Sequence, residues 1–356
     1  MLSDPSGSVS ARRVLPVTVS RGRRWRQRAI TWPAILLGAP LLVLLSPVLF
    51  TATFVADLMT GPRRLRWSRL LAMGLHYVVL GWLGLVAGGA LWVATGFGLF
   101  MRRPWSRRLH YRFQQWWTAA VLAGVERWLG AAVDIEDGHL AADGPMIVAA
   151  RHASFFDAVL PTVVLGRHSN ELSRHVLKIE LTWEPLLDLF GHRHPNHFVR
   201  RGASDRHEEL AAIAALGHGT HTDALVIFPE GTFRTATRAA RIMERFAERE
   251  PERAHRLDLD HLLPARPGGI GALLETRPDA DLVLIAHTGF EAFGSFRSII
   301  ANVPFRRPVE IKVWRVAAAD LASAPEERMA AVDHWWQKMD DWIGERLAAH
   351  GHEARR

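Results

Sequence analysis

The chain has 356 residues, more than one small domain needs, so we expect a sizeable α/β core with an additional segment. It has 44 lysines and arginines against 36 aspartates and glutamates, which favours an anionic partner such as nucleic acid, anionic lipid or a phosphorylated substrate. It has no cysteine, so disulfides, thiolate metal sites and cysteine nucleophiles are excluded. Any nucleophilic step must therefore use oxygen or nitrogen.

The N-terminal part of the sequence predicts a membrane anchor. Residues 1–28 are rich in serine and arginine and are predicted to be a basic, disordered segment. Residues 29–56 have no charged side chain, and residues 70–101 have no Asp, Glu, Lys or Arg. Each stretch is long enough to cross the roughly 30 Å hydrocarbon core. More arginines flank the two stretches than lie between them, which favours a membrane hairpin over 29–110 with both ends cytoplasmic.

Two features leave the geometry of this hairpin open. The loop between the stretches carries four arginines, and Pro33, Pro40 and Pro47 would kink the first helix, so a re-entrant hairpin in one leaflet is the alternative to full spanning. Gly84 and Gly88 form a G-x-x-x-G pattern that allows close helix packing. Glycine is common in such spans, so we assign this pair no function.

Residues 111–350 are predicted to form an α/β domain: a mixed sheet with flanking helices. Short aliphatic and β-branched runs predict strands at 145–150, 224–228, 282–287 and 309–316. Amphipathic periodicity predicts helices at 111–133, 206–216, 238–249, 269–275 and 325–350. The last helix has an apolar stripe that we expect to cover the core, formed by Met329, Val332, Trp336, Met339 and Ile343.

His152 directly follows the first of these strands. Ligand sites of α/β sheets lie at the carboxyl ends of strands, so His152 is a candidate general base, with Asp157 five residues later holding its tautomer. The alternative is structural, because Ser154 to Asp157 fits the S-x-x-D capping pattern of a helix start.

A second group follows the strand at 224–228. Glycine at 231 permits close approach of a ligand to the backbone, Thr232 offers a hydroxyl, and Arg234 suits a phosphate. A third group closes the apolar segment 178–201, where two arginines follow Phe198 and Val199.

We expect no metal and no cofactor. His192, His194 and His197 have only Asp188 as a nearby carboxylate, and Pro195 breaks any shared helical face. Walker-type, G-x-G-x-x-G and G-x-S-x-G motifs are missing from the sequence.

In this order and spacing, these segments resemble the 1-acylglycerol-3-phosphate acyltransferase (lysophospholipid acyltransferase) family. The family's H-x-x-x-x-D motif is matched by His152 and Asp157, and its acceptor-binding arginine by Arg201 in Phe198-Val199-Arg200-Arg201-Gly202. Its F-P-E-G-T motif is matched by Phe228 to Thr232, and its last motif is similar to Leu263-Pro264, with Arg266 in the extended form of one branch. The resemblance covers residues 144–316.

The sequence departs from the family at one position. Phe233 stands where the family has an arginine after the threonine, and Arg234 comes one residue later. In an extended segment this shift turns the side chain to the other face, whereas in a turn the guanidinium still reaches the phosphate. Both alternatives stay open.

The resemblance implies an acyltransferase of phospholipid biosynthesis at an anionic membrane. His152 and Asp157 would be catalytic, deprotonating an acceptor hydroxyl that attacks a thioester of acyl-CoA or acyl carrier protein. The substrate-binding residues would be Arg201, Glu230, Gly231, Thr232, Arg234, Pro264 and Arg266, holding lysophosphatidate or a similar lysophospholipid. The catalytic domain would lie on the cytoplasmic side.

Two other functions compete with this one. A membrane-tethered lipid-binding protein could keep the fold without turnover, but the intact His152 and Asp157 argue against it. A nucleic-acid-binding protein ranks last, because the arginines cluster beside apolar stretches and not along a helix with interleaved aromatic residues.

Overall fold

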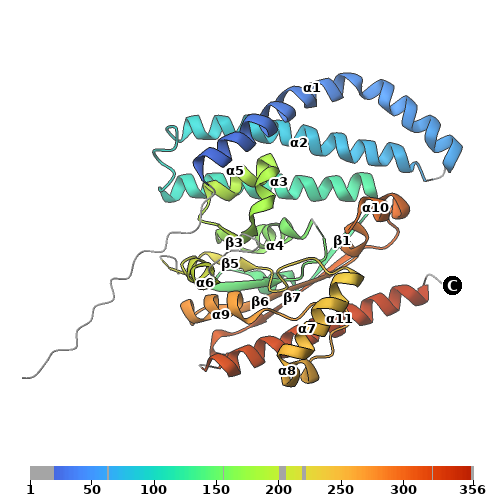
Figure 1. Ribbon diagram of the computed structural model, residues 1–356. Coiled ribbons are helices and arrows are strands. Elements are labelled where there is room, and N and C mark those ends of the chain that lie inside the picture. Colours follow the sequence, from blue (N-terminus) through green and yellow to red (C-terminus); the bar gives the residue numbers. More distant parts are fainter. Residues whose placement is uncertain are drawn as a thin grey trace, which may run out of the picture.

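The computed structural model describes residues 20–61, 64–154, 156–199, 206–218, 222–322 and 324–353. A layer of long N-terminal helices lies over a sheet that has helices on both faces (Figure 1). The helices are α1 (Arg21–Thr60), α2 (Arg66–Ala94), α3 (Pro104–Gly124), α4 (Leu160–His168), α5 (Pro185–Arg193), α6 (Arg206–Ala214), α7 (Ala236–Arg249), α8 (Pro251–Arg256), α9 (Pro267–Thr276), α10 (Phe296–Asn302) and α11 (Pro325–Glu353). The strands are β1 (Val133–Glu136), β2 (Met146–Ala150), β3 (Ser173–Lys178), β4 (His197–Val199), β5 (Ala224–Ile227), β6 (Asp281–Thr288) and β7 (Val309–Val316).

The two apolar stretches form α1 and α2, which are long and apolar enough to cross a membrane. Helix α1 already begins at Arg21, so residues 21–28 are helical, whereas the disorder predicted for residues 1–19 lies outside the described residues. The first turns are held because Gln27 is buried and the Arg28 Nε donates to Asp188 Oδ2 at 2.6 Å. The prolines at 33, 40 and 47 lie inside α1, which arches in Figure 1.

Helix α2 packs sideways onto α3 and α5. A Cβ atom on Gly84 would lie 2.7 Å from Leu186, and one on Gly88 would lie 2.9 Å from Leu189, so a larger residue at either position would force the leucine side chain to shift. The carbonyl of Gly88 accepts a hydrogen bond from Arg193 Nη2 at 2.7 Å. The G-x-x-x-G pair, to which we assigned no function, therefore allows close contact between α2 and α5.

The strands form one sheet in the order β1-β7-β6-β2-β5-β3-β4. Its pairs are parallel except for β6 with β7, which is antiparallel, so the predicted mixed sheet is confirmed. The four predicted strands are present with ends displaced by one residue at most, whereas β1, β3 and β4 were not predicted.

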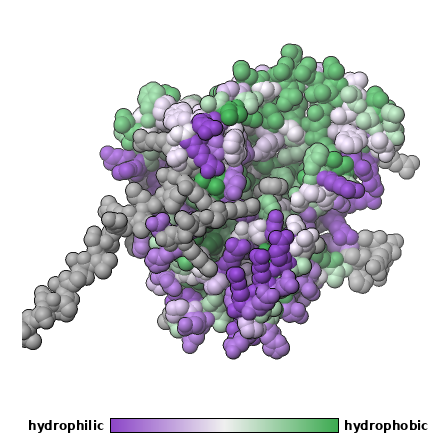
Figure 2. Space-filling view, viewed as in Figure 1, coloured by the Kyte–Doolittle hydropathy of each residue, from purple (hydrophilic) through white to green (hydrophobic). Residues whose placement is uncertain are grey.

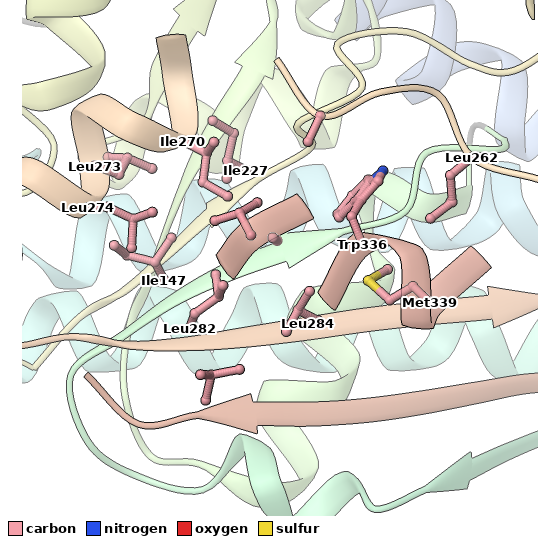
Figure 3. Packing of buried hydrophobic residues seen from close by; sticks show 14 of the residues in the cluster. Ile147, Ile227, Leu262, Ile270, Leu273, Leu274, Leu282, Leu284, Trp336 and Met339 are labelled. Atoms are coloured by element: carbon pink, nitrogen blue, oxygen red, sulfur yellow. The ribbon is translucent and has the colours of Figure 1, made fainter. Parts of the chain in front are cut away.

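Each face of the sheet has its own apolar core. On one face, side chains of α6, α7, α9 and α11 pack against β2, β5 and β6. Figure 3 shows the part of this core where α9 and α11 meet the three strands. The predicted stripe of α11 lies in this core, and Trp336 Nε1 donates to the carbonyl of Leu263 at 2.9 Å, which fixes the segment before α9. On the other face, α2, α3 and α4 cover the sheet. The helical hairpin and α7 thus belong to opposite sides of the sheet (Figure 1).

Candidate active site

The site begins where β2 ends. All five residues of β2 are buried, and the chain leaves the strand at Arg151 and His152. With the proton on Nδ1, His152 faces Asp157 Oδ2 at 3.3 Å, within the loop that precedes α4. This arrangement leaves Nε2 of His152 without a proton, as a base requires.

Asp157 is fully buried and satisfies the loop around it. Its Oδ2 accepts from the amides of Ala153 and Ser154, the latter at 2.6 Å, and its Oδ1 accepts from Ser154 Oγ at 2.8 Å. The capping contacts of the S-x-x-D pattern and the contact to His152 therefore occur together. The two readings of this motif do not exclude each other.

A second histidine, His287, lies close to Oδ1 of Asp157, the carboxylate oxygen that does not face His152. His287, near the end of β6, has its Nε2 3.2 Å from Asp157 Oδ1, and neither side chain is exposed. Burial alone would raise the pKa of Asp157, but the His287 and His152 imidazoles outweigh it, and the pKa is lowered. Asp157 therefore stays ionised. His287 was not predicted, although the sequence placed it at the end of a strand.

Lys178, at the carboxyl end of β3, faces the other nitrogen of His152. Its Nζ lies 3.1 Å from His152 Nε2 and 4.7 Å from the centre of the Phe233 ring. Burial lowers the pKa of His152 and the Lys178 charge lowers it further, against the opposing effect of Asp157. His152 is consequently neutral near pH 7. Lys178 was not among the predicted site residues.

These groups line an apolar pocket. Its walls come from the segment after β2 and from the ends of β3, β4 and β5 with the segments that follow them. They are His152, Ala158, Val176, Leu177, Lys178, Leu181, Val199, Phe228, Gly231 and Phe233. Phe233, at the family's arginine position, packs edge-on against the His152 ring at 4.3 Å between centres. The residue that departs from the family motif is thus a wall of the pocket.

Glu230 is buried next to the residues that line this pocket. Its Oε1 accepts from the amide of His152 at 2.7 Å and its Oε2 from the amide of Leu263 at 3.1 Å. Burial raises its pKa to about 7, although these amides and the charge of Arg151 oppose the rise. The carboxylate therefore ties the His152 loop to the segment before α9, and this geometry supports a positioning role.

The other predicted binding residues are distributed unevenly. Gly231 has φ +67° and lines the pocket, and the exposed Arg266 guanidinium lies against it, about 3 Å from where a Cβ would stand. Thr232, in the same turn, is half-buried. Arg234 instead donates to the carbonyl of Asp260. Pro264 is buried, so its side chain packs in the protein. Arg201 lies outside the described residues.

Arg151, at the start of the loop that contains His152, connects this loop to neighbouring segments. Its guanidinium donates to the carbonyl of His287, to Glu291 and to the carbonyl of His261. These contacts join β2, β6 and the segment before α9. The histidines between residues 192 and 197 lie elsewhere, and no metal-binding cluster of three His, Cys, Asp or Glu side chains occurs among the described residues.

One comparison with known protein families agrees with the motifs. Residues 132–259 match a family model described as Acyltransferase. No curated protein matches the chain. Among solved structures, the chain is similar to the 1-acyl-sn-glycerophosphate (LPA) acyltransferase PlsC from Thermotoga maritima, at 16% identity and a TM-score of 0.43, over 76% of this chain and 98% of that one. The family match contains both His152 with Asp157 and the turn at Glu230.

Proposed function

We propose that the protein moves a fatty acyl group from a thioester donor to the free hydroxyl of lysophosphatidate or a similar lysophospholipid, because residues 132–259 match the Acyltransferase family model. The observation that carries the proposal is the pairing of His152 with a buried, ionised Asp157 at an apolar pocket that also holds a lysine. The pathway would be phospholipid biosynthesis.

His152 acts as the general base in this proposal. Its Nε2 takes the proton of the acceptor hydroxyl while the hydroxyl oxygen attacks the thioester carbonyl carbon. The C–S bond then breaks, and the sulfur of the carrier leaves as a thiol after receiving the proton from the imidazole. Asp157 accepts the Nδ1 hydrogen bond and stabilises the imidazolium, so no covalent enzyme intermediate is needed.

Lys178 and Arg266 are the described cations best placed for the phosphate of the acceptor. Lys178 lies inside the pocket on His152, and the Arg266 guanidinium lies at Gly231 on the pocket wall. A phosphate that pairs with the Lys178 ammonium would draw it from His152 Nε2 and leave that atom open to the acceptor hydroxyl. Arg201 keeps its predicted role in the same contact, whereas the bond from Arg234 to Asp260 argues against one for Arg234.

The apolar walls supply a place for the acyl chain. Leu177, Leu181 and Val199 line the pocket on the side of β3 and β4, and the helical turn that contains Leu181 continues to the half-exposed Trp183 and then to α5. Helix α5 packs against α1 and α2. The acyl chain would therefore leave the pocket toward the helical hairpin.

We further propose that the hairpin holds the protein on a membrane. Large apolar side chains of α1 are exposed, among them Leu44 at 75% and Met59 at 83%, and they gather on the upper surface in Figure 2. The buried side of α2 runs from Ala72 to Gly88, which is about 24 Å of helix at 1.5 Å per residue, and it packs on α3 and α5.

Helix α2 contacts the catalytic domain over a length close to the thickness of the hydrocarbon core. If α2 crossed the bilayer perpendicular to its plane, the catalytic domain beside it would also have to enter the hydrocarbon core. The packing of α2 therefore supports the hairpin buried in one leaflet over full spanning. The arginine distribution continues to favour the cytoplasmic side for the catalytic unit.

The test is thioester consumption and acyl transfer to lysophosphatidate by the full-length protein in detergent micelles or vesicles. We expect His152→Ala to lower turnover by roughly two to four orders of magnitude without changing the melting temperature much. His139→Ala is the matched control, because His139 belongs to the short helical turn Gly138–Ala141 after β1, away from the pocket. Near-normal turnover of His152→Ala would remove His152 from the mechanism. No thioester consumption by the wild type would favour the non-catalytic lipid-binding alternative.

A further inference from the structure

Helix α7 presents a row of four arginines, and only the first of them has a hydrogen-bond partner among the described residues. Arg238, Arg241, Arg245 and Arg249, here called the arginine stripe, follow one another at three- and four-residue steps and so share one side of the helix. The opposite side carries Met243 and Phe246 into the core of the sheet. The last three arginines are exposed and make no hydrogen bond or ion pair with any described residue.

The spacing of the stripe costs helix stability. Arg241 and Arg245, and likewise Arg245 and Arg249, are like charges four residues apart, which destabilises a helix by a few tenths of a kcal/mol per pair. Glu244 and Glu248 lie along one edge of the stripe, yet no ion pair joins them to it among the described residues. The repulsion between these arginines is not balanced by ion pairs within the described residues, so binding of an acidic partner would reduce it.

The position of α7 excludes the membrane as this partner. The helix packs in the core of the sheet face that bears α9 and α11, and the apolar hairpin covers the other face (Figure 1). In Figure 2 the hydrophobic surface is at the top, over α1 and α2, and hydrophilic side chains gather on the lower part, where α7 lies. An anchored protein therefore turns the stripe toward water.

The stripe also leads directly to the pocket. Helix α7 starts three residues after Phe233, and the Arg238 Nη1 donates to the carbonyl of Phe233 at 2.9 Å. From Arg238 to Arg249 the stripe extends about 16 Å along an exposed helix. A small nucleotide is bound in a concave site, whereas a convex row of this length suits the surface of a protein.

We infer that the arginine stripe of α7 docks an acidic acyl carrier protein, which presents its acyl thioester to the pocket beside Phe233. This inference rests on the proposed function and selects the carrier protein from the two thioester donors. Exposed charges of this kind act mainly on the rate of association, and their effect weakens as the salt concentration rises.

The experiment uses the full-length protein in vesicles, with lysophosphatidate as acceptor and either palmitoyl-acyl carrier protein or palmitoyl-CoA as donor. We compare the wild type with the triple variant Arg241→Glu, Arg245→Glu, Arg249→Glu. The control is Arg306→Glu with Arg307→Glu, which reverses two exposed arginines in the loop before β7. We expect the triple variant to lose at least about tenfold in kcat/KM with the carrier protein, and to change less than about twofold with palmitoyl-CoA.

Binding of the carrier protein is measured separately from turnover. The inference predicts that the wild type and the control bind it in a salt-dependent way and that the triple variant does not. An equal loss with both donors, unchanged binding, or a wild type that binds no carrier protein would each overturn the inference. Loss of vesicle attachment in the triple variant would overturn it in favour of the membrane. A wild type that transfers acyl groups from palmitoyl-CoA but does not bind the carrier protein would leave the proposed function standing.

Discussion

Replacement of Lys178 by methionine separates two roles that the geometry gives to this side chain. The ammonium lies 3.1 Å from His152 Nε2, where the phosphate of an acceptor would compete for it. Methionine keeps an unbranched chain of similar length but no charge. Losing one charge-assisted contact in a partly buried pocket costs about 1.5 to 3 kcal/mol, so the acceptor KM should rise roughly ten- to hundredfold.

The same substitution should act on the base itself. In the free protein the Lys178 ammonium lies on the lone pair of His152 Nε2, and in the proposed mechanism this contact would suppress attack of water on the thioester. Lys178→Met should therefore raise thioester hydrolysis in the absence of acceptor. Because the Lys178 charge lowers the pKa of His152, its removal raises that pKa, and the acid limb of the rate profile should move to higher pH.

The assay records thiol release from the donor with and without lysophosphatidate between pH 5 and 8. Lys338→Met is the matched control, because Lys338 lies over the Trp335 ring on α11, away from the pocket. An acceptor KM and a pH profile both equal to those of the wild type would refute the reasoning. If Lys178→Met lowered kcat but left both thioester hydrolysis and the pH profile unchanged, Lys178 would have only a structural role.

Three further changes test other contacts. Burial raises the pKa of Glu230 to about 7, so the stability that this group contributes is present below about pH 4.5 and is lost as the pH rises to about 7; Glu230→Gln should flatten the melting temperature over that interval. Gly84→Leu should overpack the contact with Leu186 and lower stability by about 1 to 3 kcal/mol by thermal melting, whereas Gly74→Leu, with open space around its Cβ, should be nearly neutral. Arg234→Ala should raise the acceptor KM less than Arg201→Ala does, because the Arg234 guanidinium already donates to Asp260; an equal or larger rise would show that the turn brings Arg234 to the phosphate.

The sequence predicted the parts of the fold whose burial follows a regular pattern. The strands β2, β5 and β6 are mainly runs of aliphatic residues, and β7 alternates apolar with charged residues, so the hydrophobic pattern alone reveals them. The pattern missed β3, because this strand carries Arg174 and His175 in buried positions. The buried guanidinium of Arg174 is stabilised because its Nε donates to Asp223 at 2.7 Å. Asp223 is far away in sequence, so a local pattern of residues does not reveal this partner.

The same limit applies to the site. His152 and Asp157 lie five residues apart, so their pairing could be proposed from spacing. Lys178 and His287 come from strands that are far away in sequence, and only the order β6-β2-β5-β3 brings their ends to the same edge of the sheet. A histidine and a lysine at two strand ends are visible in the sequence, but which atom of the base each one faces depends on this strand order.

The aromatic residue at position 233 shows how one departure from a motif changes a whole cluster of charges. An arginine there would place a second cation beside both the Lys178 ammonium and the His152 ring, where repulsion between like charges a few ångströms apart amounts to several kcal/mol at an effective dielectric constant of about 20. The Phe233 ring instead attracts the ammonium, which lies 4.7 Å from its centre, and packs against the imidazole. Lys178 can then lie on His152 Nε2 until an anion removes it. In the proposed mechanism, Phe233 would therefore move phosphate recognition from the turn after β5 to the end of β3, next to the base.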